Sequence, residues 1–302
     1  MLPVKIHTER AESYERPAAP LLSELVERIG ADGDRFLVVN RIPDEPDGFV
    51  QVWHEAGGDY RLEHRAGSPD LHFTASVRTT AEVARVMLGW ARQESGWDLG
   101  PAWERLDFPV EEAPPLEAGV EEELTGLVRE RLLCGYDDRA ALAEYAGYVL
   151  GSADGSPVSP AQAWRLVDRL WRERVAEQAG WEGETDPERL TRAFEALDAG
   201  GITARENFTC CRTCGLGEIR GDGEEDARGF VFFHSQCTGG VAAGHDLWLL
   251  YGGFEGGDEL TVSVGREVVA ALDGVGLKWV WDGSAQDAVR VTGLDWRKRL
   301  IG

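Results

Sequence analysis

Four of the five cysteines lie between residues 210 and 237, and their spacing is the strongest sign of chemistry in the chain. Cys211 and Cys214 are separated by two residues, which lets both thiolates reach one ion across a tight turn. His234 and Cys237 repeat this spacing, so the pattern reads Cys211-x2-Cys214-x19-His234-x2-Cys237. Three sulfur ligands and one imidazole suit a tetrahedral Zn²⁺ site. We therefore expect Zn²⁺ as the cofactor, with Cys210 as a spare ligand.

This ligand set depends on where the neighbouring strand ends. Residues 229–234 read as a strand, in which alternate side chains point to opposite faces. The strand must end near Phe233 if His234 and Cys237 are to point the same way. His245 is an alternative ligand.

Two other interpretations of the thiols stay open. Cys211 and Cys214 also form a C-x-x-C dithiol, a redox motif that usually sits at the N-terminus of a helix. The residues after Cys214 are rich in glycine and are poor helix formers, so we rank redox chemistry below zinc. Free cysteines also serve as small buried hydrophobic residues. The sequence identifies no catalytic residue.

The elements that precede the cysteines predict an α+β protein. In residues 1–108, apolar spacing predicts a helix over 20–30 and, after the capping pair Thr79 and Glu82, a second helix. Four strands are predicted between them, over 36–42, 49–55, 60–65 and 71–77. The short turns between the strands predict an antiparallel meander sheet with helices on one face.

A Pro- and Glu-rich linker at 109–119 separates this domain from a second one, which we place at 120–302. The second domain begins with a helical segment of about four helices, the last starting at Asp186. It continues into a small α/β unit that carries the cysteine cluster. Strands are expected over 229–234, 247–251, 277–281 and 289–291, and a helix over 264–275.

Three histidines, His54, His64 and His72, lie on neighbouring predicted strands of the first domain. Their even spacing allows them to share one face of the sheet. We expect them at polar positions on the solvent face.

The charge balance limits the classes of partner. With 54 Asp and Glu against 31 Lys and Arg, the net charge is −23. Such a charge disfavours nucleic acid and anionic membranes, both of which are bound through Lys and Arg. It favours a basic protein partner. Because no apolar run follows a basic start and none is long enough to span a bilayer, we expect a cytoplasmic protein.

Several segments resemble a domain-of-unknown-function family, DUF6891, that is frequent in actinobacteria. The resemblance rests on Gly201-Ile-Thr-Ala-Arg-Glu-Asn-Phe-Thr-Cys-Cys-Arg-Thr-Cys-Gly215, with Arg228-Gly-Phe-Val-Phe-Phe-His-Ser-Gln236 and Leu294-Asp-Trp-Arg-Lys298, and it covers residues 120–302. It implies no activity. Members often carry an acidic residue at the position of Cys237, which implies Cys210, Cys211, Cys214 and His234 as the ligand set.

The N-terminal domain resembles small actinobacterial sheet domains, including immunity proteins of polymorphic toxins. The stretch Tyr60-Arg-Leu-Glu-His-Arg-Ala-Gly-Ser-Pro-Asp-Leu-His-Phe73 carries this resemblance. Our leading hypothesis is therefore that the protein is a non-enzymatic protein-interaction module of an immunity-like kind. The alternative is a metal-binding or thiol-dependent enzyme or sensor that uses Cys210–Cys214 and His234.

Overall fold

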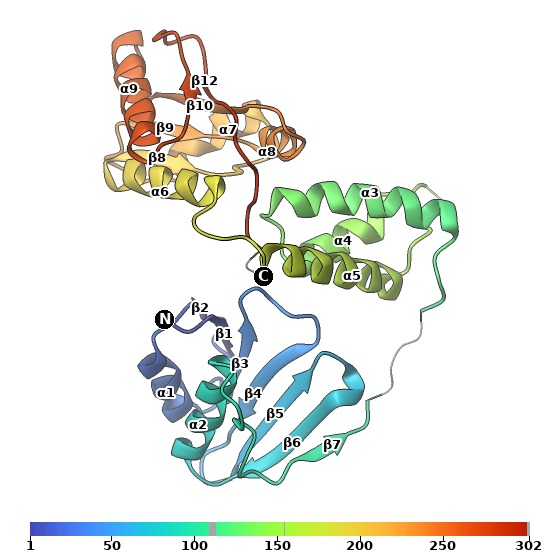
Figure 1. Ribbon diagram of the computed structural model, residues 1–302. Helices are drawn as coiled ribbons and strands as arrows, with labels where there is room; N and C mark the ends of the chain where they lie inside the picture. The colour runs from blue at the N-terminus through green and yellow to red at the C-terminus, as the bar shows by residue number, and fades with distance from the viewer. Residues whose placement is uncertain (109–112, 154, 301–302) are drawn as a thin grey trace. The chain divides into compact units, whose positions relative to one another are not determined.

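A computed structural model describes residues 1–108, 113–153 and 155–300 (Figure 1). Contacts within the chain divide it into two compact units. The first comprises residues 1–117, 138–176 and 300–302, and the second comprises residues 118–137 and 177–299. Each unit has a hydrophobic core of its own.

The division into the predicted domains, 1–108 and 120–302, stays a prediction. Residues 109–112 of the predicted linker, 109–119, lie outside the described residues. The predicted helical segment is divided between the two units. Its helices α4 (Arg139–Tyr148) and most of α5 (Pro160–Gln178) group with the N-terminal sheet. Arg139 forms an ion pair with Asp44 at 2.7 Å, and Trp171 Nε1 donates to the Asp44 carbonyl, also at 2.7 Å.

Within the described residues, the first unit holds a seven-stranded antiparallel sheet in the order β2-β1-β3-β4-β5-β6-β7. The strands are β1 (Val4–Thr8), β2 (Ser13–Glu15), β3 (Phe36–Arg41), β4 (Gly48–Trp53), β5 (Tyr60–Ala66), β6 (His72–Val77) and β7 (Glu104–Leu106). The chain-consecutive strands β3 to β6 pair in sequence order, so the predicted antiparallel meander and the α+β class are confirmed. The short strands β1, β2 and β7 extend the sheet beyond the prediction.

Two helices, α1 (Ala19–Arg28) and α2 (Thr80–Ala91), cover one face of this sheet (Figure 1). Thr79 Oγ1 accepts a hydrogen bond from the Glu82 N–H at 3.3 Å, which confirms the predicted start of α2. Buried residues of both helices form one core with alternate residues of the strands. The helices cover the face whose strand residues, such as Leu37, Val50 and Leu62, are fully buried.

The prediction that the three histidines lie on the solvent face is wrong, because all three are buried. His54 stacks on Tyr60 with ring centroids 3.8 Å apart, and His64 lies between the rings of Phe73, Trp97 and Trp103. His64 pairs with Phe73 across the ladder, whereas His72 pairs with Arg65. His64 and His72 therefore lie on opposite faces, because neighbouring residues of a strand alternate in direction.

His72 is held on the face opposite the helices by polar neighbours. Arg65 Nε donates to His72 Nδ1 at 3.1 Å, and His72 Nε2 lies 3.2 Å from Glu63 Oε2. The ring is buried although it lies outside the main core, because Phe49 and Phe108 contact it.

The second unit is built on a five-stranded sheet, counted over the described residues, in the order β11-β12-β10-β9-β8. Its elements are α3 (Ala118–Cys134), α6 (Asp186–Ala199), β8 (Ile202–Arg205), α7 (Arg212–Glu218), β9 (Gly229–Phe232), α8 (Ser235–Ala242), β10 (Leu247–Gly253), α9 (Asp258–Gly274), β11 (Trp279–Val280) and β12 (Val289–Val291). Strands β8 and β9 run parallel, and the other pairs are antiparallel.

Both faces of β9 are packed, as its continuous apolar sequence predicts. Val231 belongs to the core that α6 and α9 share with the sheet. Phe232 points the other way and contacts the ring of Phe208, and Gly215 of α7 packs against it. Both Val231 and Phe232 are fully buried.

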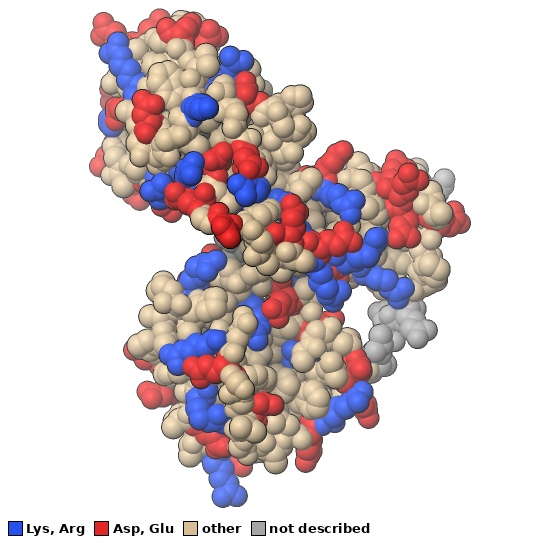
Figure 2. All heavy atoms as spheres, viewed as in Figure 1, with Lys and Arg blue, Asp and Glu red and all other residues tan. Residues whose placement is uncertain are grey.

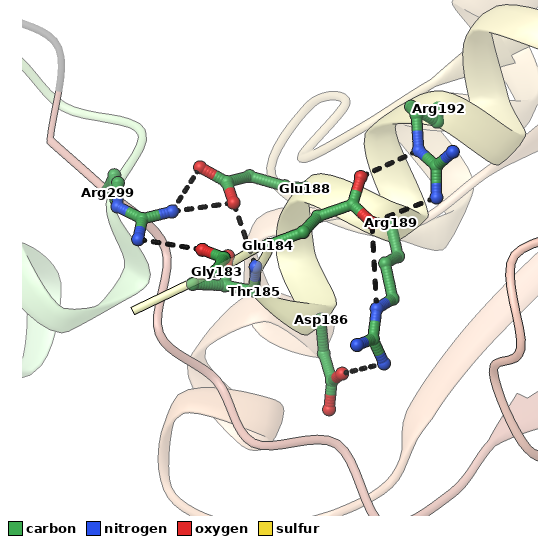
Figure 3. Close-up of polar contacts among 8 residues, drawn as sticks. All are labelled: Gly183, Glu184, Thr185, Asp186, Glu188, Arg189, Arg192 and Arg299. Carbon is green, nitrogen blue, oxygen red and sulfur yellow. Dashed lines mark hydrogen bonds and ion pairs between the residues drawn. The ribbon is translucent and has the colours of Figure 1, made fainter. Parts of the chain in front are cut away.

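The basic C-terminal segment folds back on the second unit (Figure 3). Arg299 Nη1 donates to both carboxylate oxygens of Glu188 at 2.6 Å, and its Nη2 donates to the carbonyls of Trp181 and Gly183 at 3.0 Å. Glu188 also accepts from the Thr185 N–H at 2.8 Å in the capping box of α6. Arg299 thus stabilises the start of α6.

Acidic and basic side chains are interspersed over both units on the face that Figure 2 shows. The net charge of −23 is therefore distributed rather than confined to one segment. No helix in the described part of the chain combines the length and the apolar character that crossing a bilayer requires.

Candidate metal centre

Four of the five cysteines and His234 follow two parallel strands. The segment after β8 carries Cys210, Cys211 and Cys214, and the segment after β9 carries His234 and Cys237. Because parallel strands end at the same edge of a sheet, both segments leave the sheet there. This edge is where open α/β sheets bind ligands. Strand β8 is not among the strands predicted from the sequence, so the parallel pair is a finding of the structure.

Backbone hydrogen bonds join the two segments. The Phe208 N–H donates to the Phe233 carbonyl at 2.8 Å, and the Ser235 N–H donates to the Thr209 carbonyl at 3.2 Å. Ser235 Oγ also donates to the Cys210 carbonyl at 3.2 Å. Thr209 has a φ of +59°, which turns the chain sharply just before the cysteines.

The three thiols of the segment after β8 form one group. The Sγ atoms of Cys210, Cys211 and Cys214 all lie within 4.8 Å of one another, and those of Cys210 and Cys214 are 3.6 Å apart. Cys210 is exposed, and the other two are half-buried. An incoming ion or reagent can therefore reach the group from solvent.

A short helix sets this arrangement, although the sequence did not predict one. Helix α7 begins at Arg212, so Cys211 is its N-cap and Cys214 lies in its first turn. The glycines after Cys214 are poor helix formers, but Gly215 fits against Phe232 where a Cβ atom would lie 2.6 Å from the ring Cζ. Packing against β9 thus overrides the low helix propensity. The expectation that no helix forms after Cys211 is therefore wrong, and with it the reason for ranking redox chemistry below zinc.

The thiols of the cluster differ in acidity. The Cys214 N–H and the thiols of Cys214 and Cys210 donate to the sulfur of Cys211 and lower its pKa. Hydrogen bonds with Cys210 and Cys211, followed by the charge of these sulfurs, raise the pKa of Cys214 to about 11. Cys211 therefore loses its proton before Cys214 does.

His234 and Cys237 form a second group. Strand β9 ends at Phe232, before His234, so the predicted condition for their convergence is met. His234 Nε2 lies 3.4 Å from Cys237 Sγ, and the two residues are the N-cap and the third residue of α8. Burial lowers the pKa of His234 and raises that of Cys237, so both are neutral near pH 7.

The structure thus brings the five predicted ligands into two groups. Among the described residues, Cys210, Cys211 and Cys214 are the set of three or more side chains placed to share one ion, and His234, Cys237 and His245 lie outside it. Nδ1 of His234 is buried and finds no hydrogen-bond partner among the described atoms. A Cys3His or larger ligand set stays a prediction.

A polar network lies beside the edge at which β8 and β9 end, and it was not predicted from the sequence. Glu206, the first residue after β8, accepts from the Tyr136 hydroxyl at 2.5 Å and from Lys298 Nζ at 2.9 Å. Burial, followed by the charge of Glu206, raises the pKa of Tyr136 well above its usual value. Tyr136 and Lys298 are distant in sequence from Glu206. Because β8 was not predicted, the sequence carried no signal that Glu206 lies at a strand end.

Comparisons with known proteins give one match. A family model described as "Domain of unknown function (DUF6891)" matches residues 117–300. The search of curated proteins and the search of solved structures each returned no match. The match covers more than half of the chain and includes the thiol cluster, His234 and Cys237. On this evidence, the chain belongs to the DUF6891 family.

Proposed function

We propose that the second unit binds a thiophilic divalent cation, Zn²⁺, through Cys210, Cys211 and Cys214. The observation that carries the proposal is the 3.6 Å separation of the Cys210 and Cys214 sulfurs. In a tetrahedral site with Zn–S bonds of about 2.3 Å, neighbouring sulfurs lie about 3.8 Å apart. The thiols are thus already spaced as ligands of one ion.

The chemistry of the donors supports the same ion. Thiolates are soft ligands, which favour Zn²⁺ over Mg²⁺ or Ca²⁺. Three protein ligands leave one of four positions for water or another ligand, and the exposure of Cys210 gives access to it. Such an open position is typical of zinc sites that act on a bound molecule, whereas purely structural sites are closed.

Metal analysis of protein purified without chelator tests the proposal. We expect zinc close to one equivalent in the wild-type protein and its loss in Cys214→Ser. Cys134→Ser is the matched control, because Cys134 lies in α3, outside the cluster. In a Co²⁺-loaded sample, the thiolate-to-metal charge-transfer absorption should fall in Cys214→Ser and stay in Cys134→Ser. Metal-free wild-type protein that also fails to take up added Zn²⁺ or Co²⁺ would refute the proposal.

The interaction with a basic protein stays a prediction that rests on the net charge of −23. The interspersed charges of Figure 2 do not by themselves mark a docking face. An immunity-like role also stays a prediction. The thiol cluster favours the metal-dependent alternative.

A further inference from the structure

The thiol cluster has features that metal binding alone does not require. One of its members, Cys210, is exposed, whereas Cys211 and Cys214 are half-buried. Cys210 points its sulfur at that of Cys214, at 3.6 Å. A disulfide bond has an S–S length of about 2.05 Å, so the two sulfurs need to approach by about 1.5 Å to form one. Side-chain rotation at the exposed Cys210 can supply this movement.

The role of Cys211 differs from that of its neighbours. Its sulfur accepts hydrogen bonds from the backbone N–H groups of Cys214 and Thr213, which hold it at the start of α7. Cys210 precedes the helix and is the thiol that a reagent from solvent meets first. The two thiols of the pair therefore differ: solvent reaches Cys210, and Cys214 is the half-buried thiol toward which Cys210 points.

We propose that Cys210 and Cys214 carry out thiol–disulfide exchange with a small-molecule disulfide and become joined in a reversible disulfide bond. The Cys210 thiolate attacks one sulfur of the small disulfide, forms a mixed disulfide and releases the first small thiol. The Cys214 thiolate then attacks the Cys210 sulfur and releases the second small thiol. The protein loses two electrons and two protons, and the small disulfide gains them.

This chemistry also regulates the site if the proposed metal binding holds. The Cys210–Cys214 disulfide removes two of the three thiolate ligands, so it releases the ion. Reduction by a dithiol restores both ligands. The exchange step itself does not require the metal, so the two proposals can fail separately.

The chain offers a direct assay, because trypsin cleaves after Arg205, Arg212 and Arg220. Cys210 and Cys211 then lie on peptide 206–212, and Cys214 lies on peptide 213–220. Reduced, chelator-treated protein is mixed with glutathione disulfide, quenched with a thiol-alkylating reagent and digested. We expect the two peptides joined by a disulfide, two glutathione thiols released per chain, and separation of the peptides by dithiothreitol.

Variants identify the bond. Cys210→Ser should lose the linked peptides, and Cys211→Ser should keep them. Cys214→Ser should stop at glutathione attached to Cys210, which intact mass detects. Cys134→Ser is the matched control and should behave as wild type, because Cys134 lies in α3, outside the cluster. Circular dichroism checks that each variant is folded. Wild-type protein that yields no linked peptides overturns the proposal, as does a link that survives Cys210→Ser but not Cys211→Ser.

A parallel measurement of zinc separates this result from that of the proposed function. Zinc-loaded protein is treated with glutathione disulfide, and the released ion is measured with a colorimetric chelator. Linked peptides in a protein that never binds zinc overturn the metal proposal alone. Zinc binding without linked peptides overturns the exchange proposal alone.

Discussion

In the first unit the histidines lie within or just after antiparallel strands, whereas in the second unit four of the five cysteines and His234 follow two parallel strands. His54 stacks on Tyr60, and His64 lies among the rings of Phe73, Trp97 and Trp103. Cys210, Cys211 and Cys214 instead contact one another, with Cys210 exposed. An antiparallel meander distributes such residues over both faces, and a parallel pair collects them at one edge.

The two sets of residues therefore have different roles: the buried histidines stabilise the fold, and the accessible thiols are available for chemistry. A histidine packed between rings contributes to the core and is closed to ligands. Thiols at a strand edge are held by few contacts and stay accessible. Changes in the two units should therefore differ in kind, and the following four experiments test this from the largest expected effect to the smallest.

The largest effect is expected from Gly215→Ala. The added Cβ would lie 2.6 Å from Cζ of Phe232, so α7 must shift away from β9. We expect a loss of about 3 kcal/mol in the free energy of unfolding, the upper range for overpacking, and faster hydrogen exchange around the cysteines. Gly217→Ala is the control in the same helix, because nothing lies within 4 Å of its Cβ position. Equal behaviour of the two variants would show that α7 is not seated by Phe232.

Acid should destabilise the first unit through His64. Burial lowers its pKa from 6.5 to about 4, so the unfolded chain binds a proton that the folded unit does not. Stability therefore falls as the pH drops below 6.5, and the loss is complete near pH 4. We expect a loss of about 2–3 kcal/mol over this range.

Urea titrations at several pH values measure this loss. His64→Phe keeps an aromatic ring among Phe73, Trp97 and Trp103 and should flatten the pH dependence. The exposed His245 is the control, and His245→Gln should leave the slope unchanged. An unchanged slope in His64→Phe would assign the acid sensitivity to other groups.

Arg299→Ala tests how far polar contacts hold the second unit. Burial raises the pKa of Glu188, but hydrogen bonds from Arg299 and from the Thr185 N–H outweigh it, so the net pKa is lowered. Both partners are partly exposed, so we expect a loss of about 1–2 kcal/mol and a rise in the pKa of Glu188. Thermal melting and an NMR titration of Glu188 measure these changes.

Arg299→Lys is the informative control for that experiment. Lysine keeps the charge but cannot donate to both carboxylate oxygens and the two carbonyls in the planar geometry of arginine. It should recover part of the lost stability. Full recovery would mean that charge alone matters at this contact.

The smallest effect is expected from Thr79→Ala at the start of α2. Loss of the hydrogen bond from the Glu82 N–H should cost about 1 kcal/mol in the first unit. Thr79→Ser keeps the cap and should be close to wild type in a urea titration. A neutral Thr79→Ala would show that α2 is held by its buried face alone.

Local patterns predicted much of the fold. The β3–β6 meander, α1, α2 and the start of α6 follow from alternation, helical spacing and capping residues. The missed elements are short. β1, β2, β7 and β8 span three to five residues each, and such segments are ordered by pairing with a neighbouring strand rather than by their own propensity.

The site was predicted less completely than the fold. The spacing of Cys211 and Cys214 indicated a shared site, and the structure places these thiols together with Cys210. The pairing of His234 with Cys237 depends on where β9 ends and on the direction of α8. Whether His234 joins the thiol cluster depends on tertiary structure, because His234 lies twenty residues after Cys214 and spacing does not measure a distance over such a separation.

The sequence alone determined that the cysteines meet locally, because Cys210, Cys211 and Cys214 span a single turn. It also determined the distributed acidic charge and the α+β class. The tertiary structure decided which thiols share a centre, that α7 forms despite its glycines, and that His54, His64 and His72 are buried. The physical reason is that these outcomes depend on packing partners, such as Phe232 for Gly215 and Trp97 for His64, that lie far away along the chain.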